Sequence, residues 1–157
     1  PQTSKKYPEA SKIIGQLNEH DPTRIPYRPA LARLLYKGKQ VEPALDMYAS
    51  SLKLYPDSLV VVLPYATTLL STDQAETAFE LLADSSNRHP LNPEVYNLLA
   101  RAAGATNRKV QTHTAMSQYF FLNGYTTQAI EQLQLAEKQP GLSNYQTSRI
   151  QEDIKNL

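Results

Sequence analysis

Apolar side chains recur at intervals of three and four residues along most of the chain. Leu31, Leu34 and Leu35 follow this spacing, and so do Leu45 and Tyr48. Such spacing gathers apolar side chains on one face of an α-helix, whereas a half-buried strand would alternate every second residue. The sequence therefore predicts an all-α protein whose helices cover residues 7–20, 26–37, 41–55, 58–71, 73–88, 93–106, 109–123, 126–138 and 144–156.

Prolines and capping residues mark several of the predicted helix starts. Pro43 and Pro93 fall in first turns, where the missing N–H is tolerated, and Asn92 is placed to cap the helix that Pro93 begins. Ser143 and Gln146 have the spacing of a capping box, which indicates the start of the last helix.

Pro64 lies too far into the helix predicted over 58–71 to belong to its first turn. A proline there offers no N–H to the carbonyl four residues earlier, and its ring crowds that carbonyl. We therefore expect this helix either to begin late or to kink near residue 60.

Four sets of residues repeat along the chain at an interval of 34 residues. They are Pro22, Pro56 and Pro90; Ala10, Ala44 and Ala78; Ile14, Tyr48 and Leu82; and Ala32, Ala66 and Ala100. The alanines allow neighbouring helices to approach closely, and each proline ends the second helix of a pair. The interval predicts a stack of helical hairpins and not a single compact core.

The repeating unit resembles the tetratricopeptide repeat (TPR) family, in which small and large residues alternate in this way before a closing proline. The unit from Ile25 carries Leu31, Ala32, Leu35, Ala44, Tyr48, Ser51 and Pro56, and the unit from Leu59 carries Val62, Tyr65, Ala66, Leu69, Ala78, Leu82, Ser85 and Pro90. The resemblance implies a helical-hairpin solenoid of about four TPR-like repeats. It covers nearly all of 1–157, which we interpret as a single domain with a polar lead-in at 1–6.

The C-terminal half departs from this pattern. Arg28 already replaces the usual large residue in the first full unit, and Thr112 occupies an alanine position in the third. A further unit beginning near Val110 recovers the pattern with residues such as Gly124 and Ala129, but it is shifted by 17 residues. The shift equals one helix, so the helix over 109–123 belongs to two alternative readings of the repeat.

Composition and charge narrow the function classes. The chain has 16 Lys and Arg against 15 Asp and Glu, and no cysteine, which excludes disulfide scaffolds, cysteine-ligated zinc and thiol nucleophiles. Residues 1–55 carry nine basic and five acidic side chains, residues 56–107 carry two and six, and residues 108–157 carry five and four. The resulting net charges of the three segments are +4, −4 and +1. This basic bias is too weak for a nucleic-acid binder.

Neither a membrane span nor a signal peptide is predicted. The most apolar stretch, Leu59 to Leu70, is short and contains Pro64 and two threonines. The chain opens on a polar run without an apolar segment, so we expect it to be a fragment of a longer protein.

The sequence predicts no catalytic residue, cofactor or metal site. His20, His89 and His113 lack the partner spacing of a zinc site, and we interpret them as solvated side chains near loops. The glycines are isolated, so no phosphate-binding loop is expected, and no nucleophile-elbow motif is present.

Binding of a protein or peptide is the function that the TPR resemblance implies. In that family the first helix of each pair lines a concave groove, with positions 2, 5, 9, 12 and 13 of the unit facing it. Carried onto this sequence, the candidate groove residues are Arg33, Tyr36, Lys37, Leu63, Thr67, Leu70, Asn97 and Arg101. A partly apolar groove with cationic ends suits a peptide with some acidic character, although the same leucines could be core and the same arginines solvated.

Two further observations bear on the binding surface. Pro29 and Arg33 stand where TPR domains that bind a chaperone's C-terminal carboxylate carry Lys and Asn, which disfavours that ligand. Tyr119, Phe121 and Tyr125 form a candidate second surface, because three consecutive aromatics spread around a helix and cannot all face its core. Phe120 is the one that we expect in the core.

The C-terminal string from Met116 to Leu142, followed by Asn144 to Ile150, resembles the tail of bacterial M48-family zinc metalloproteases. No His-Glu-x-x-His motif is present, so the resemblance implies a detached, non-catalytic TPR domain of such an enzyme. It implies a periplasmic location and, as partners, the outer-membrane β-barrel assembly machinery and its substrates. The alternatives are a stand-alone scaffold or co-chaperone, and a hydrolase whose site is hidden in the irregular third repeat.

Overall fold

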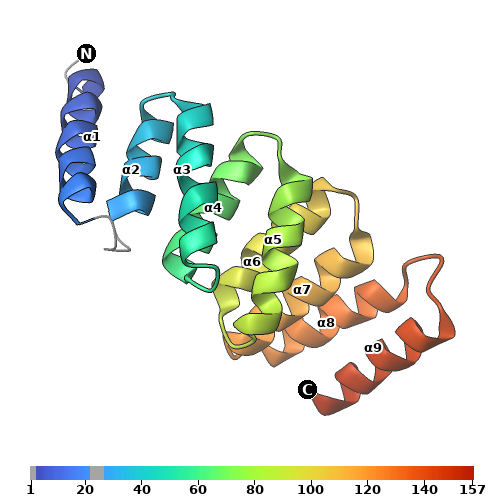
Figure 1. Ribbon diagram of the computed structural model, residues 1–157. Helices are drawn as coiled ribbons and strands as arrows, with labels where there is room; N and C mark the ends of the chain where they lie inside the picture. Colours follow the sequence, from blue (N-terminus) through green and yellow to red (C-terminus); the bar gives the residue numbers. More distant parts are fainter. Residues whose placement is uncertain (1–2, 22–26) are drawn as a thin grey trace. The chain divides into compact units, whose positions relative to one another are not determined.

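A computed structural model describes residues 3–21 and 27–157, and these residues form nine α-helices and no strand (Figure 1). The helices are α1 (Thr3–His20), α2 (Tyr27–Lys37), α3 (Val41–Leu54), α4 (Leu59–Ser71), α5 (Ala75–Arg88), α6 (Pro93–Ala105), α7 (Lys109–Leu122), α8 (Thr126–Glu137) and α9 (Asn144–Asn156). The all-α class and the order of the helices are confirmed. Pro22 and Pro26, which the sequence placed at a helix end and a helix start, lie outside the described residues.

The first helix begins earlier than predicted. α1 starts at Thr3, so residues 3–6 are helical, while residues 1–2 lie outside the described residues. The sequence predicted a start at residue 7, whereas Pro8 lies inside the helix. A polar run carries no apolar periodicity, which is the signal that would have extended the prediction.

Pro64 also lies inside its helix. α4 begins at Leu59 after the N-cap residue Ser58, so the alternative of a late start is wrong. Pro64 cannot donate to the carbonyl of Val60. The adjacent threonines donate to carbonyls of the same stretch, with Thr67 Oγ1 at 2.8 Å from Leu63 O and Thr68 Oγ1 at 2.9 Å from Pro64 O. The predicted kink stays a prediction.

The predicted capping signals at two helix starts are confirmed. The side chain of Asn92 accepts hydrogen bonds from the backbone N–H groups of Glu94, at 3.0 Å, and Val95, at 3.2 Å. Ser143 and Gln146 form the reciprocal capping box at the start of α9, with distances of 2.9 and 3.2 Å. These bonds satisfy N–H groups that a helix start otherwise leaves without partners.

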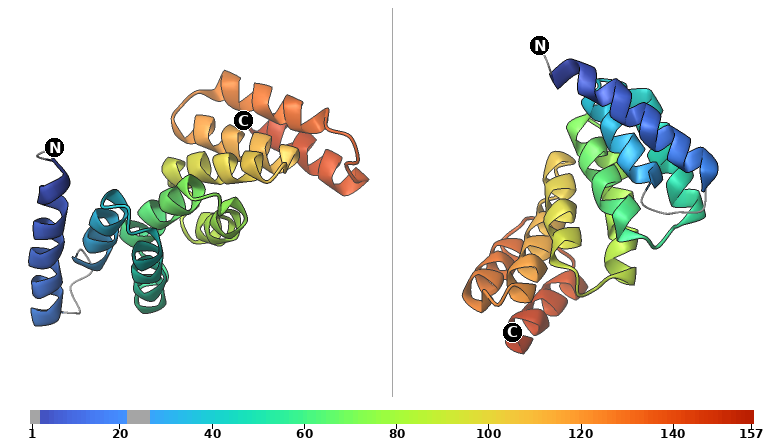
Figure 2. Two further views of the ribbon diagram at one scale, coloured as in Figure 1. Left: turned by 90° about the horizontal axis from the view of Figure 1, so that it is seen from above. Right: turned by 90° about the vertical axis from the view of Figure 1, so that its left-hand side faces the viewer.

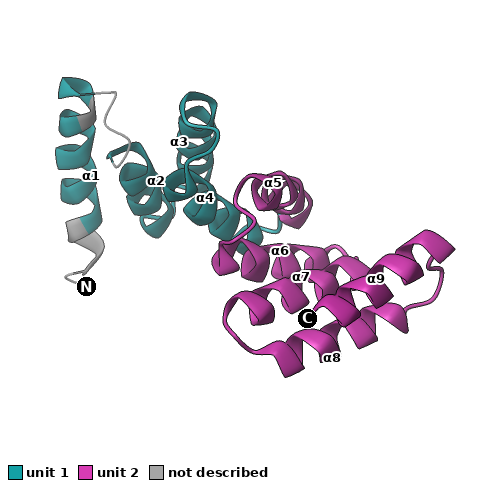
Figure 3. Ribbon diagram, turned by 90° about the horizontal axis from the view of Figure 1, so that it is seen from below, with its two compact units in different colours: residues 1–74 teal, residues 75–157 magenta. Residues whose placement is uncertain are grey.

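Contacts divide the chain into two compact units, residues 1–74 and residues 75–157 (Figure 3). In unit 1, α2 packs against α1, α3 and α4. In unit 2, α6 packs against α5 and α7, α7 against α8, and α8 against α9 (Figure 2). Each unit is therefore built from helices packed against their neighbours in sequence, as a helical repeat requires.

The alanines of the 34-residue period lie where helices touch. Ala32, Ala44, Ala66 and Ala78 are completely buried, and Ala100 is nearly so. Among the large residues of the period, Tyr48 and Leu82 are also completely buried. The tyrosine ring stacks on that of Tyr65, with the ring centroids 5.6 Å apart, and so joins α3 to α4. The alanines of the period from Ala32 to Ala100, together with Tyr48 and Leu82, thus belong to the cores of the two units.

The turns inside the hairpins share one backbone conformation. Lys39, Asp73 and Asn107 have φ angles of 64°, 57° and 58°, in the left-handed region that residues other than glycine seldom adopt. In each case the next residue's N–H bonds to the carbonyl five residues earlier, as Gln40 does to Leu35 at 2.9 Å. The three turn residues are spaced by 34, so the backbone carries the period that the sequence predicted.

The same turn recurs 17 residues after Asn107. Gly124 has a φ of 82°, and the N–H of Tyr125 bonds to the carbonyl of Phe120 at 2.9 Å. α7 therefore ends one hairpin and begins the next, packing against both α6 and α8. α7 is thus the second helix of one hairpin and the first helix of the next, as the two frames of the repeat predicted. Because its sequence serves both roles, it matches neither unit fully.

The threonine at the alanine position of the third repeat is accommodated locally. Thr112 is half-buried in α7, and its hydroxyl donates to the carbonyl of Arg108 at 2.9 Å. Across from it stands Gly104 of α6, where an added Cβ would lie 3.9 Å from the Thr112 side chain. The larger side chain on α7 thus faces α6 without a steric conflict.

No helix within the described ranges has both the length and the apolar character needed to cross a bilayer. α4 is the most apolar helix of unit 1, and it has 13 residues. A transmembrane helix needs about 20.

Candidate functional site

The predicted groove residues of unit 1 lie on α2 and α4 and are partly accessible. Arg33 and Lys37 are exposed and Tyr36 is half-buried, so α2 presents two cations to solvent. Leu63 and Leu70 on α4 are half-buried. Thr67 is exposed, but its hydroxyl is bonded to the backbone of its own helix. These six positions remain a predicted contact surface of unit 1.

The remaining groove residues belong to unit 2. Asn97 is half-buried on α6 and its side-chain amide donates to the carboxylate of Glu94 at 3.3 Å, while Arg101 is exposed. The predicted groove thus draws its residues from both units. A single groove that runs from Arg33 to Arg101 stays a prediction.

The predicted aromatic surface is mostly the packing of one turn. The ring of Phe120 meets those of Tyr119 and Tyr125 edge to face, with centroids 5.6 and 6.4 Å apart. Phe120 is half-buried and not in the core as expected. Phe121 is 42% exposed and Tyr125 is 54% exposed, so these two remain candidates for contact with a partner.

The interpretation of the histidines as solvated loop residues is wrong for His113. This residue lies in the middle of α7 and is half-buried. Its Nδ1 is 2.9 Å from the side-chain oxygen of Gln132, so it joins α7 to α8. Within residues 3–21 and 27–157, no group of three or more His, Asp and Glu side chains is placed to hold a metal ion.

A feature that the sequence did not predict is a cavity of about 510 Å³ in unit 2, which we call the α5–α9 cavity. Its lining comes from α5, α6, α7, α8 and α9. The apolar part of the lining includes Phe79, Tyr96, Leu99, Val110, Leu133 and Ile150. A concave, mainly apolar site of this size is typical of ligand-binding pockets, which span about 300–1,000 Å³.

Polar side chains stand among these apolar ones. Amides and hydroxyls come from α5 and α7, and one charge of each sign comes from α9; they include Ser86, Asn87, Gln111, Thr114, Gln118, Arg149 and Asp153. Burial raises the pKa of Tyr96 above its ordinary value of 10.0. The cavity can bury apolar side chains of a ligand and offer hydrogen bonds to its polar backbone.

One wall of the cavity is fixed by an ion pair. Arg108, the N-cap residue of α7, donates to both carboxylate oxygens of Glu76 on α5, at 2.8 Å through Nη1 and more closely through Nη2. The guanidinium also lies 4.3 Å from the ring centroid of Phe79, which lines the cavity. Bidentate pairing and the cation–π contact together hold the start of α7 against α5.

This ion pair makes the stability of unit 2 depend on pH. The hydrogen bond from Arg108 lowers the pKa of Glu76 below its ordinary value of 4.5. A lowered carboxyl pKa stabilises the folded state at pH above the ordinary value, and this contribution is lost as the pH falls through the lowered pKa. We expect Glu76→Gln to lower the melting temperature at pH 7 and low salt. The difference from the wild type should shrink as the pH is lowered through the reduced pKa of Glu76, which circular dichroism melts at a series of acidic pH values can measure.

Sequence reasoning missed the cavity because it counted binding positions in one frame only. In the unit that begins at Val110, the second, fifth and ninth positions are Gln111, Thr114 and Gln118. All three line the cavity. The shifted frame therefore contained the signal, with α7 acting as the first helix of a hairpin.

Comparison with known proteins agrees with this architecture. Residues 35–102 match the family model described as tetratricopeptide repeat. No curated protein sequence matches the chain. One similar solved structure is a MamA double mutant from strain RS-1, with 14% identity and a TM-score of 0.69; the match covers 99% of this chain and 90% of that one. Another is MamA 41-end from Desulfovibrio magneticus RS-1, with 15% identity and a TM-score of 0.68; the match covers 99% of this chain and 91% of that one. A MamA structure from AMB-1 is similar over 91% of this chain and 88% of that one (19% identity, TM-score 0.51).

At these identities the structural likeness shows the fold alone. The chain has a TPR-like helical-repeat fold, as the 34-residue period predicted. The relation to M48 metalloproteases finds no counterpart in these comparisons.

Proposed function

We propose that this chain is a non-catalytic protein-interaction module that binds a peptide segment in the α5–α9 cavity. The proposal rests on one observation, the mainly apolar cavity lined by five helices of a TPR-like stack. Stripes of side chains on neighbouring helices form a groove in such a stack, and a peptide docks by filling it with spaced apolar side chains. Because the charged lining consists of Arg149 and Asp153, we propose a ligand that is mainly apolar and not strongly charged.

Selection from a displayed random-peptide library against the full chain tests this proposal. Selected peptides should carry apolar residues at regular spacing. Their affinity is then measured by fluorescence anisotropy for the wild type and for Thr114→Trp, which places a large ring in the cavity. We expect the plugged variant to bind at least about tenfold more weakly, equivalent to about 1.4 kcal/mol.

Thr127→Trp is the matched control, because Thr127 is exposed on α8 and does not line the cavity. It should bind selected peptides as the wild type does. Equal affinity of Thr114→Trp and the wild type, with both variants folded by circular dichroism, would place the peptide elsewhere and overturn the proposal.

A finer proposal concerns the biological setting. The resemblance of the C-terminal string to M48 metalloproteases supports a periplasmic role beside such an enzyme. The partners would then be the outer-membrane β-barrel assembly machinery or its unfolded substrates. A stand-alone scaffold or co-chaperone with the same cavity accounts for the fold equally well.

Pull-down with purified assembly-machinery components separates these two settings. The periplasmic role would be supported if the chain captures these components, the selected peptide competes with them, and Thr114→Trp abolishes the capture. Peptide binding without any such capture would favour the stand-alone scaffold. Capture that depends on Arg33 and Arg101, tested with Arg33→Glu plus Arg101→Glu, would instead support the predicted groove.

A further inference from the structure

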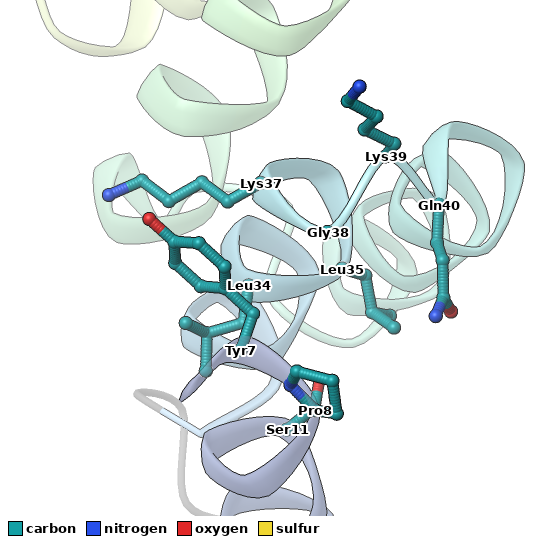
Figure 4. A pocket seen from close by; sticks show the side chains of 9 residues that line it. All are labelled: Tyr7, Pro8, Ser11, Leu34, Leu35, Lys37, Gly38, Lys39 and Gln40. Atoms are coloured by element: carbon teal, nitrogen blue, oxygen red, sulfur yellow. The ribbon is translucent and has the colours of Figure 1, made fainter. Parts of the chain in front are cut away.

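Unit 1 holds a second pocket, of about 530 Å³, between α1 and the turn that joins α2 to α3 (Figure 4). We call it the α1–α2 pocket. Tyr7, Pro8 and Ser11 line it from α1, and Leu34 and Leu35 provide apolar surface from α2. It belongs to a different unit from the α5–α9 cavity, so the function proposed above does not involve it.

The charged side chains that line this pocket are both cations. Lys37 ends α2 and Lys39 follows it in the turn, and Figure 4 shows them on either side of Gly38. Both are exposed, and in the described part of the chain neither forms an ion pair. No carboxylate is among the lining residues, so the electrostatic potential of this pocket favours an anionic ligand.

The backbone holds one of these lysines in place at a cost. Lys39 has a φ of 64°, while the equivalent turns carry Asp73 and Asn107, whose short polar side chains tolerate the left-handed region. Two backbone hydrogen bonds of 2.9 Å, from Gly38 to Leu34 and from Gln40 to Leu35, fix the turn. The turn therefore holds an exposed lysine at the edge of the pocket, in a conformation that residues other than glycine seldom adopt.

Polar groups and apolar surface then define the ligand. Ser11 and Tyr7 bring hydroxyls, and in Figure 4 the hydroxyl of Tyr7 points to the same side of the pocket as Lys37. The two leucines are half-buried, which leaves part of their surface open to a ligand. Unit 1 has nine basic and seven acidic side chains, so it lacks the basic stripe that a nucleic-acid backbone needs.

We propose that the α1–α2 pocket binds a short acidic peptide segment in which an apolar side chain is flanked by carboxylates. The apolar side chain contacts Leu34 and Leu35, and the carboxylates pair with Lys37 and Lys39. A pocket of this volume accepts a few residues and not a whole helix. The chain thus has two peptide sites of different chemistry, one acid-selective and one apolar.

Fluorescence anisotropy with a labelled peptide, acetyl-Glu-Leu-Asp-Glu-Leu-amide, tests the proposal on the full chain. The neutral analogue acetyl-Gln-Leu-Asn-Gln-Leu-amide is the reference probe. We expect the acidic peptide to bind at least about fivefold more tightly at about 50 mM salt, and this preference to fall at about 500 mM salt, where charges are screened within about 4 Å.

Lys39→Gly is the decisive variant, because it removes the cation and also relieves the left-handed backbone. Its melting temperature should not fall, and its affinity for the acidic peptide should drop at least about threefold. Lys53→Gln, which removes an exposed cation of α3 outside the pocket, is the matched control and should bind normally. Ser11→Trp fills the pocket without changing charge and should also weaken binding.

Three results would overturn the proposal. The first is equal binding of the acidic and neutral peptides. The second is an equal loss in Lys39→Gly and Lys53→Gln, which would mean attraction to the net charge of unit 1. The third is tighter binding of a single-stranded oligonucleotide than of the peptide, with the oligonucleotide binding lost in Lys39→Gly. Normal binding of the acidic peptide by Thr114→Trp separates this site from the α5–α9 cavity.

Discussion

Replacing Tyr48 with alanine is expected to cost unit 1 about 3–5 kcal/mol of stability, the range measured for large aromatic truncations in protein cores. Tyr48 is the largest fully buried side chain, and its ring stacks on Tyr65 at a centroid distance of 5.6 Å. Truncation removes this contact between α3 and α4 and leaves a cavity that rigid helices cannot close. Because whole domains are stable by only about 5–15 kcal/mol, this loss is a large share of the stability available to unit 1.

Hydrogen exchange measured by mass spectrometry checks this result helix by helix. Amides of α2, α3 and α4 should lose protection, while α6, α7 and α8 should keep theirs, because contacts in a helical repeat are made with near neighbours. Equal loss of protection in both units would show that the chain unfolds as one cooperative body.

Tyr48→Phe separates the ring from its hydroxyl. Burial raises the pKa of Tyr48 above its ordinary value of 10.0, although a hydrogen bond with Thr68 and the charge of Arg33 oppose the shift. A raised pKa stabilises the folded state at pH below the ordinary value, and this stability is lost as the pH rises through the raised pKa. The phenylalanine variant should therefore keep most of the stability at pH 7 and show a weaker loss than the wild type above pH 10.

The helices could be predicted from the sequence because the core residues and the prolines that end helices follow the same 34-residue interval. Ala44, Ala78, Tyr48 and Leu82 are completely buried, as their shared interval indicated. The turns were harder to read. Left-handed backbone is usually signalled by glycine, but the three hairpin turns of the main frame place Lys39, Asp73 and Asn107 there. Their regularity became visible only in the backbone.

The binding sites were harder still, because they depend on which faces the stacked helices leave uncovered. The predicted groove used the frame in which α2, α4 and α6 are the first helices of their hairpins. The α5–α9 cavity uses the shifted frame, in which α7 begins a hairpin that closes through Gly124. A sequence alone shows both frames but not which one is open to a ligand. The α1–α2 pocket depends on how α1 packs on α2, and the spacing of repeated residues does not predict that packing.

Ile150→Ala is expected to release α9 from unit 2 and to abolish peptide binding in the α5–α9 cavity. Ile150 is 4% exposed and packs with Leu133 and Ala136 of α8, and Val110 and Leu142 lie against the same cluster. Truncating a buried isoleucine costs about 2–5 kcal/mol, and α9 packs against α8 as its helix neighbour. That cost is large enough for α9 to undock while α6, α7 and α8 stay folded.

Undocking matters for binding because α9 forms one wall of the cavity. Tyr145, Arg149 and Asp153 line it together with Ile150. Hydrogen exchange should show loss of protection in α9 alone, and peptides selected on the wild type should bind at least about tenfold more weakly.

Ile154→Ala is the matched control, since Ile154 packs on the edge of the same cluster but does not line the cavity. Ile154 is half-buried, so its truncation should cost less and leave α9 docked. Binding that survives the loss of protection in α9 would show that this helix only covers the stack, and the peptide site would then have to lie on α5, α6 and α7.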